Sequence, residues 1–313
     1  EFPDTPVQAT PDDLSREELT AWLHQYPKGV LLSAVGLYNR IEHEARLAAR
    51  EAGLPIVALT DSWFNDAERF ERQEGTQTRQ SHPDAVCAID TLTQSALLDA
   101  GFQPGQVILT GHPDLERTVR LCRETSPEEA RELKEKLQVG DAELLFTFFS
   151  DPFFTGPGRQ FYSGPGAIMD PEGKGLYGYT VETVLPDILQ ELELALKEAQ
   201  TRAHLLVRPH PSEDPEVLEQ ILKNAPTQFL QVNLAEKGPA TDCIRISQAT
   251  LGMMTIALLQ SALAGVPAIS YQPGLPETGM EDPCMSNTLG HTLGVSDRKP
   301  LRRKFLEEHT HAE

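Results

Sequence analysis

The sequence predicts an α/β protein with parallel sheets, and three observations lead to this prediction. Short apolar runs recur along the 313-residue chain, and segments of helical periodicity separate most of them. Glycines and capping residues stand at several of the junctions. The alternation breaks once, between Gly111 and about Gly140, and then resumes. Strands separated by helices form right-handed crossovers and a parallel sheet, so we expect two such units in tandem.

The first part of the chain begins with a helix and continues with strands. Ser15 and Glu18 have the spacing of a capping box, which begins a helix through Leu23. The apolar run at 29–33 is typical of a buried parallel strand. The further strands expected are 55–60, 85–89 and 106–110, with helices at 40–52 and 93–100.

The second part repeats the pattern after the break. Ser126 and Glu129 form another capping box, which begins a charge-rich helix at 127–137. The strands expected beyond it are 143–149, 204–208, 228–234, 249–253 and 268–271, with helices at 181–200, 215–223 and 255–264. The segment from Asp151 to Tyr179 is rich in Gly, Pro and Tyr and has no periodicity, which in a compact domain indicates a functional or a disordered loop.

Composition and charge exclude several classes of function. The chain has 27 Lys and Arg against 47 Asp and Glu, a formal net charge of −20, which argues against a nucleic-acid-binding protein. One local anion pocket remains compatible with that charge. The 4 cysteines lie far apart without zinc-ligand spacing, so we expect a reducing compartment and no metal.

The apolar runs also bear on localisation. No run approaches the roughly 20 apolar residues that span a bilayer. We therefore expect a cytoplasmic protein without a transmembrane segment, and peripheral contact with the inner membrane face stays open. The chain begins at Glu1 without a methionine, and we expect some N-terminal sequence to have been lost.

The strongest local signal is the stretch 251–274, which has the pattern of strand, glycine turn, helix, glycine and strand. Such a turn presents the free amides of a helix N-terminus at the carboxyl edge of a sheet, where they favour phosphate. The candidate phosphate-binding residues are Gly252, Met253, Met254 and Thr255. The alternative is an ordinary crossover that needs glycine for its turn.

The second signal is a strand that runs directly into Arg208 and His210. Pro209 and Pro211 restrict the backbone on both sides of the histidine and so orient its ring. An imidazole can protonate a leaving group or, when charged, hold a phosphate. A rigid turn in which His210 bonds only to backbone is the alternative.

Two candidates lie in the first part of the chain. Gly111 and His112 follow the strand at 106–110, where glycine permits close approach of a ligand and the histidine would face the gap between domains. An interdomain hinge explains them equally well. Asp61 follows the strand at 55–60 and can act as a base, although an aspartate there is as often a helix or turn cap.

Taken in order, these pieces resemble the GT-B glycosyltransferase superfamily, closest to its bacterial members that build surface polysaccharides. They are also similar to the UDP-N-acetylglucosamine 2-epimerases and the CDP-glycerol glycerophosphotransferases. The pieces are Thr110-Gly-His-Pro, Arg208-Pro-His-Pro and the stretch 250–274. The resemblance covers roughly residues 85 to 275.

The resemblance implies two Rossmann-like parallel-sheet domains facing a cleft. The N-terminal domain is expected to be truncated, because only about three parallel strands precede Gly111. The expected division is an acceptor-side domain at 1–113, an interdomain helical segment at 114–140, a nucleotide-binding domain at 141–297, and a tail helix at 298–313.

By the same resemblance, the protein is expected to be a metal-independent glycosyltransferase. It would move a sugar from a nucleotide-sugar co-substrate, of UDP or CMP type, to a glycan or lipid-linked acceptor. His210 would assist departure of the nucleotide with support from Arg208, Thr147 and Ser150 would border the donor, and Asp61 and His112 would face it. Gln260 stands where many relatives have a ribose-binding glutamate. The alternatives are a nucleotide-sugar 2-epimerase or hydrolase, and a catalytically inactive nucleotide-binding or assembly module.

Overall fold

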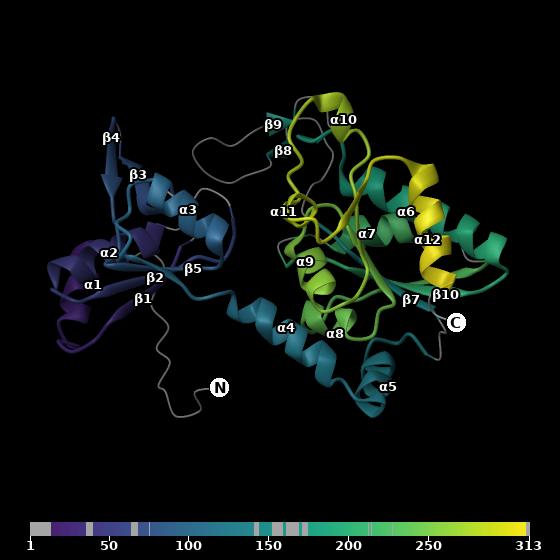
Figure 1. Ribbon diagram of the computed structural model, residues 1–313, viewed down its shortest axis with the longest axis horizontal. Coiled ribbons are helices and arrows are strands. Elements are labelled where there is room, and N and C mark those ends of the chain that lie inside the picture. The colour runs from purple at the N-terminus through teal and green to yellow at the C-terminus, as the bar shows by residue number, and fades with distance from the viewer. Residues whose placement is uncertain are drawn as a thin grey trace. The chain divides into compact units, whose positions relative to one another are not determined.

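The computed structural model describes residues 14–35, 40–63, 68–74, 76–140, 144–151, 159–160, 169–170, 175–211, 213, 215–226 and 228–310. The chain forms two compact units, one up to Pro113 and the other from Asp114 on (Figure 1). Each contains a parallel sheet, of four strands in the first unit and six in the second. The described helices include none that is long and apolar enough to cross a membrane.

The first unit has the strand order β1-β2-β5-β6, and every neighbouring pair is parallel. Four parallel strands therefore precede Gly111, at the four apolar runs where strands are expected, one more than the count of about three on which the expected truncation was based. The elements of this unit are α1 (Arg16–Leu23), β1 (Leu31–Ala34), α2 (Arg40–Glu51), β2 (Ile56–Leu59), η1 (Glu68–Phe70), the hairpin β3 (Glu71–Glu74) and β4 (Gln77–Gln80), β5 (Ala85–Ala88), α3 (Thr91–Asp99) and β6 (Val107–Leu109).

The helices of the first unit pack on one face of its sheet. Ile56 lies with α1 and α2, and Ala58 and Val86 lie with Leu97 of α3. On the opposite face Leu32 is 63% exposed and Ile108 is 49% exposed. The prediction of a buried strand at 29–33 is therefore only half right. The strand order runs in one direction across the sheet, so right-handed crossovers place every connection on the same face.

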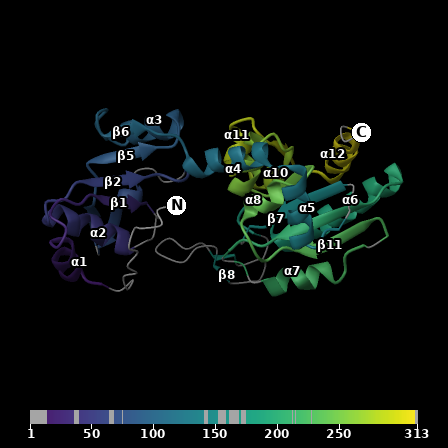
Figure 2. The same cartoon turned by 90° about the horizontal axis from the view of Figure 1, so that it is seen from below.

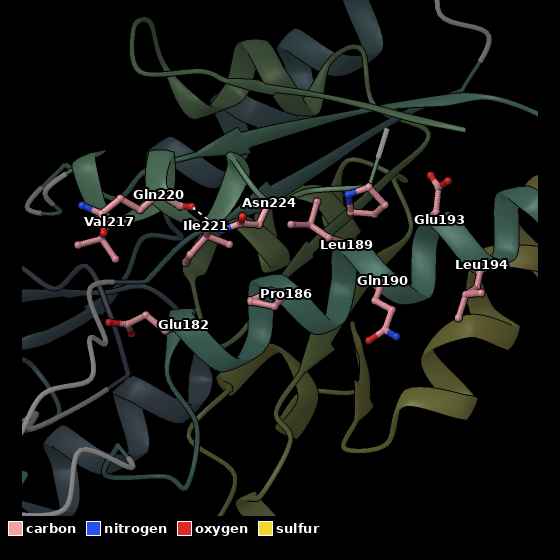
Figure 3. Close-up of a pocket in the computed structure, with 11 residues that line it drawn as sticks. Glu182, Pro186, Leu189, Gln190, Glu193, Leu194, Val217, Gln220, Ile221 and Asn224 are labelled. Carbon is pink, nitrogen blue, oxygen red and sulfur yellow. Dashed lines mark hydrogen bonds between the residues drawn. The ribbon is translucent and has the colours of Figure 1, made fainter. Parts of the chain in front are cut away.

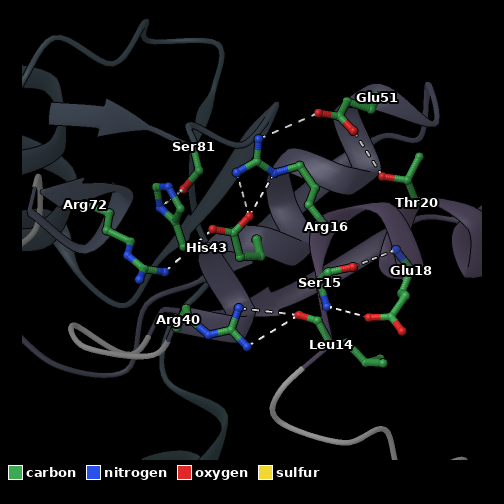
Figure 4. A network of polar contacts seen from close by, with 11 residues as sticks. Leu14, Ser15, Arg16, Glu18, Thr20, Arg40, His43, Glu51, Arg72 and Ser81 are labelled. Carbon is green, nitrogen blue, oxygen red and sulfur yellow. Dashed lines mark hydrogen bonds and ion pairs between the residues drawn. The ribbon is translucent and has the colours of Figure 1, made fainter. Parts of the chain in front are cut away.

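Polar contacts join the elements of the first unit (Figure 4). The α1 capping box is present as predicted, with the Ser15 N–H donating to Glu18 Oε2 at 2.8 Å. Arg16 of α1 pairs with Glu44 of α2 at 2.7 Å. Two residues further along α2, the buried guanidinium of Arg46 donates to Ser33 Oγ, Ser81 Oγ and the carbonyls of Ala34, Arg69 and Ser81. Burial lowers the pKa of Arg46 to about 10.

The second unit has the strand order β11-β10-β7-β12-β13-β14, again with every pair parallel. Two of these strands, β7 and β11, are labelled in Figure 2. Counted along the chain, this is the order 3-2-1-4-5-6 of a doubly wound sheet. Its elements are α4 (Pro113–Glu124), α5 (Pro127–Lys136), β7 (Leu144–Phe149), β8 (Arg159–Gln160), β9 (Met169–Asp170), α6 (Val181–Ala199), β10 (Ala203–Arg208), α7 (Pro215–Leu222), β11 (Leu230–Leu234), α8 (Ala240–Ile244), β12 (Ala249–Gly252), α9 (Ile256–Leu263), β13 (Ala268–Tyr271), α10 (Leu275–Thr278), α11 (Met285–Thr288), β14 (Leu293–Val295) and α12 (Arg298–Thr310).

Helices cover both faces of this sheet. Successive side chains of β7 point to opposite faces, so its even-numbered and odd-numbered residues show which helices lie on each side. Phe146 and Phe148 pack in one cluster with α6, α7 and α12. Leu145 and Phe149 pack in the other with α5, α8 and α9. Every residue of β7 is buried, as the sequence predicts for a central parallel strand.

Two segments next to the expected nucleotide-binding domain belong to the second unit. Segment 114–140 contains all of α5 and all but the first residue of α4, and Lys136 of α5 pairs with Asp242 at 2.8 Å. Helix α12 buries Leu301 and Phe305 in the larger core cluster, and Arg302 pairs with Glu191 of α6 at 2.7 Å. Helix α12 therefore packs on the second unit through its apolar side, and its basic residues lie near acidic residues of α6.

Candidate functional site at the carboxyl edge of the second sheet

The second sheet reverses its strand order between β7 and β12. From β7 the next strands in the chain, β10 and β11, are added on one side, and from β12 the strands β13 and β14 are added on the other side. Open α/β sheets bind ligands in the crevice outside the carboxyl ends of such strands. The residues that follow the two strands are Ser150 and Asp151 after β7, and Met253 to Thr255 after β12. This edge is therefore the part of the second unit where a ligand site is expected.

His210 lies in the loop that follows β10, the neighbour of β7. Its ring is half-buried, and burial lowers its pKa, which favours the neutral imidazole near pH 7. The carboxyl group of Glu213 joins this loop to the end of β7. It accepts the His210 backbone N–H at 3.0 Å and the Ser150 hydroxyl at 2.8 Å.

Asp151 follows β7 and lies at the N-terminus of α9. Its Oδ2 accepts the Met254 N–H at 3.0 Å, and the Met253 and Thr255 amides also favour its charged form. Burial outweighs these bonds and raises the pKa of Asp151 to about 6. The amides predicted to bind phosphate therefore hold an internal carboxylate.

Gly252 is needed for packing at this turn. A Cβ there would lie 3.1 Å from the Phe149 carbonyl oxygen and 3.0 Å from Thr255 Cγ2. Thr255 is the N-cap of α9, and its hydroxyl accepts the Ala257 N–H at 3.4 Å. The glycine therefore allows β7 and the start of α9 to lie close together. This is what the alternative of an ordinary crossover predicts for it.

The buried carboxyl of Asp151 predicts a pH dependence of stability. Because its pKa is raised in the folded protein, the second unit should gain stability as the pH falls through about 6 toward the ordinary carboxyl pKa. Asp151→Asn should lose this gain, on the order of 2–3 kcal/mol between pH 8 and pH 4. Denaturation followed by circular dichroism at several pH values measures it, and Trp22 and Trp63 report the first unit separately. An equal pH dependence in wild type and variant would contradict the prediction.

Three predicted site residues have other partners in the structure. Thr147 lies within β7, fully buried, with its hydroxyl 2.7 Å from Ser247 Oγ, so it does not border the crevice. The Arg208 guanidinium donates to the carbonyls of Ala235 and Gly238 beyond β11. Gln260 is buried on α9 and donates to Asp114 Oδ2 of α4 at 2.6 Å. Arg208 therefore holds the loop that follows β11, and Gln260 holds helix α4 against α9.

Asp61 and His112, the remaining predicted catalytic residues, come together in the first unit. His112 Nε2 lies 3.2 Å from the Asp61 carbonyl oxygen, which can only accept, so Nε2 carries the proton. The Asp61 carboxylate pairs with the buried Arg69 at 2.8 Å and is 70% exposed. Gly111 precedes the histidine with a positive φ of 79°, which glycine adopts without strain.

A cavity of about 740 Å³ lies elsewhere in the second unit, between α6 and α7 (Figure 3). Its centre is apolar, with Leu189, Val217 and Ile221, and it carries the carboxylates Glu182 and Glu193. None of the predicted site residues lines it. Across the described residues, no group of three or more His, Cys, Asp or Glu side chains is placed to hold a metal ion.

The sequence analysis missed Glu213 and Asp151. Glu213 is 7% exposed, and burial raises its pKa to about 7. A signal was present for it, because the His-x-x-Glu spacing of 210 and 213 lets a carboxyl reach back to an N–H three residues earlier. Asp151 follows a predicted strand end and is recognisable only once β12 lies beside β7.

No family model matches the sequence, and no curated protein matches it by sequence. Solved structures do match the fold. A UDP-GlcNAc 2-epimerase from Neisseria meningitidis bound to UDP-GlcNAc has a TM-score of 0.61 at 14% identity, over 95% of this chain and 73% of that one. The UDP-GlcNAc 2-epimerase of Methanocaldococcus jannaschii has a TM-score of 0.60 at 11% identity, over 93% and 73%.

A third match is the putative UDP-N-acetylglucosamine 2-epimerase of Listeria monocytogenes, with a TM-score of 0.61 at 12% identity, over 99% of this chain and 76% of that one. The predicted fold class is confirmed: an α/β protein with two parallel sheets and a GT-B-like fold. At these identities the likeness concerns the fold and not the activity.

Proposed function

We propose that the protein is a nucleotide-sugar-dependent glycosyltransferase that binds its donor at the carboxyl edge of the second sheet. The observation that carries the proposal is the convergence of His210, Ser150 and the α9 N-terminus where the strand order reverses. The fold is shared with an enzyme whose structure holds UDP-GlcNAc, which supports a nucleotide sugar as the ligand. The acceptor would be a glycan or a lipid-linked saccharide.

In this proposal the donor diphosphate accepts hydrogen bonds from the backbone amides of Met254 and Thr255. Asp151 then moves aside or takes up a proton. His210, neutral near pH 7, accepts a proton from the acceptor or hydrogen-bonds the departing phosphate. Asp61 and His112 of the first unit are proposed to contact the sugar or acceptor.

A second candidate is epimerisation or hydrolysis of the nucleotide sugar. The observation that favours it is the pair of buried carboxyl groups, Asp151 and Glu213. Burial raises the pKa of Asp151 to about 6 and that of Glu213 to about 7, and the charge of Asp151 also raises the pKa of Glu213. Carboxyl groups with pKa values near neutrality can donate and accept protons at the same pH.

Two measurements test the proposal. Calorimetry with UDP, CMP, CDP and GDP should show binding of one nucleotide, and failure of all four would favour the inactive-module alternative. Incubation with UDP-N-acetylglucosamine without acceptor should leave the sugar unchanged for a strict transferase. Conversion to the C2 epimer or to free sugar would instead support the second candidate.

A further inference from the structure

Glu213 holds both backbone groups of His210. Its Oε2 accepts the His210 N–H at 3.0 Å, and its own N–H donates to the His210 carbonyl at 2.9 Å. The second carboxyl oxygen accepts the Ser150 hydroxyl at 2.8 Å. One buried side chain therefore ties the histidine loop to the central strand β7.

Two prolines and one strand contact also shape this loop. Pro209 and Pro211 flank His210 and have no N–H to donate, so they restrict the backbone without bonding it to the sheet. At the end of β10 the Ser150 N–H donates to the Arg208 carbonyl at 2.9 Å, which fixes the chain up to the first proline. Beyond that proline, Glu213 bonds to both backbone groups of His210.

We infer that Glu213 is a positioning residue for His210, holding the imidazole at the crevice through the loop backbone. This inference rests on the proposed function, because it assigns a role at the same site. Glu213 need not contact a ligand to act. The titratable groups that face it are Asp151 after β7 and Glu182 on α6, and both raise its pKa.

The test compares Glu213→Ala and Glu213→Gln by the titration of the His210 ring. Glutamine can accept the His210 N–H and bond the Ser150 hydroxyl, whereas alanine can do neither. The His210 resonance is identified by its loss in His210→Ala, and its midpoint is read by ¹H–¹³C NMR without any nucleotide. Glu219→Ala, at an exposed position on α7, is the control.

Wild type, Glu213→Gln and the control should titrate below the ordinary histidine pKa of about 6.5. Glu213→Ala should titrate higher, by roughly 0.5 to 1 pH unit, because a released ring becomes more hydrated. An unchanged midpoint in Glu213→Ala, or a change in Glu213→Gln equal to that in alanine, overturns the inference. If the alanine variant does not fold, Glu213→Asp, too short to bridge Ser150 and His210, replaces it with the same expected direction.

The titration is independent of the donor, so its failure differs from failure of the proposed function, which shows as absence of nucleotide binding. Where UDP-N-acetylglucosamine is consumed, Glu213→Ala should reduce kcat by about 10- to 100-fold and Glu213→Gln should restore most of it. Equal rates in wild type and Glu213→Ala also overturn the inference.

Discussion

Replacing His210 by alanine is expected to lower turnover of a nucleotide-sugar donor by at least about 100-fold, the contribution typical of a positioned acid or base. The ring is the neutral imidazole at the carboxyl edge of the second sheet, and alanine leaves nothing to exchange a proton there. Release of UDP from UDP-N-acetylglucosamine in the presence of acceptor extract measures the effect.

The matched control is His291→Ala, because that histidine is exposed and lies outside the crevice. It should retain wild-type rates. Circular dichroism should show both variants folded, since the His210 side chain is only half-buried. Wild-type turnover in His210→Ala would remove the catalytic role from this residue and with it the main support for the proposed chemistry.

The second large effect is expected in the first unit, at Arg46. Replacement by methionine keeps most of the side-chain volume but removes the guanidinium that donates to the buried carbonyl groups of Arg69 and Ser81. Each lost partner costs about 1–3 kcal/mol, so the free energy of unfolding of the unit should fall by about 3–5 kcal/mol. The protein's two tryptophans, Trp22 and Trp63, both lie in this unit, so their fluorescence follows its unfolding in the full chain.

Arg50, one turn further along α2, is the comparison for this prediction. Its side chain is 52% exposed and bonds to Asp84 and the His82 carbonyl at the surface. Arg50→Met should cost less than about 1 kcal/mol, as exposed ion pairs do. Equal losses from the two substitutions would show that burial of the Arg46 guanidinium contributes little.

The order of the predicted helices and strands follows from local signals in the sequence. Both capping boxes form as the Ser and Glu spacing predicts. The hairpin 71–80 was not predicted, since its residues are mostly polar and show no alternation between apolar and polar positions. Helix α4 was not given separate bounds within the helical segment expected at 114–140, because its charged residues hide the apolar stripe that includes Leu115.

The candidate site was predictable only in part. The His-Pro loop and the glycine turn were found because prolines and glycine restrict or free the backbone at known positions in the chain. The expected strand at 143–149 ends at the same residue as β7, but Thr147 lies inside that strand, fully buried, with its hydroxyl at Ser247 Oγ. Gln260 was matched to a position in other enzymes, but its actual partner, Asp114, lies 146 residues away.

The sequence by itself determined most of the strands and helices of the two sheets, because backbone restriction, capping and apolar periodicity act within a few residues. The tertiary structure alone decided what the buried polar groups do. Asp151 meets the α9 amides and Glu213 meets Ser150 only after parallel pairing brings β7 between β10 and β12. Burial at that edge then raises the pKa values of both carboxyl groups, and desolvation depends on neighbours that are distant in the chain.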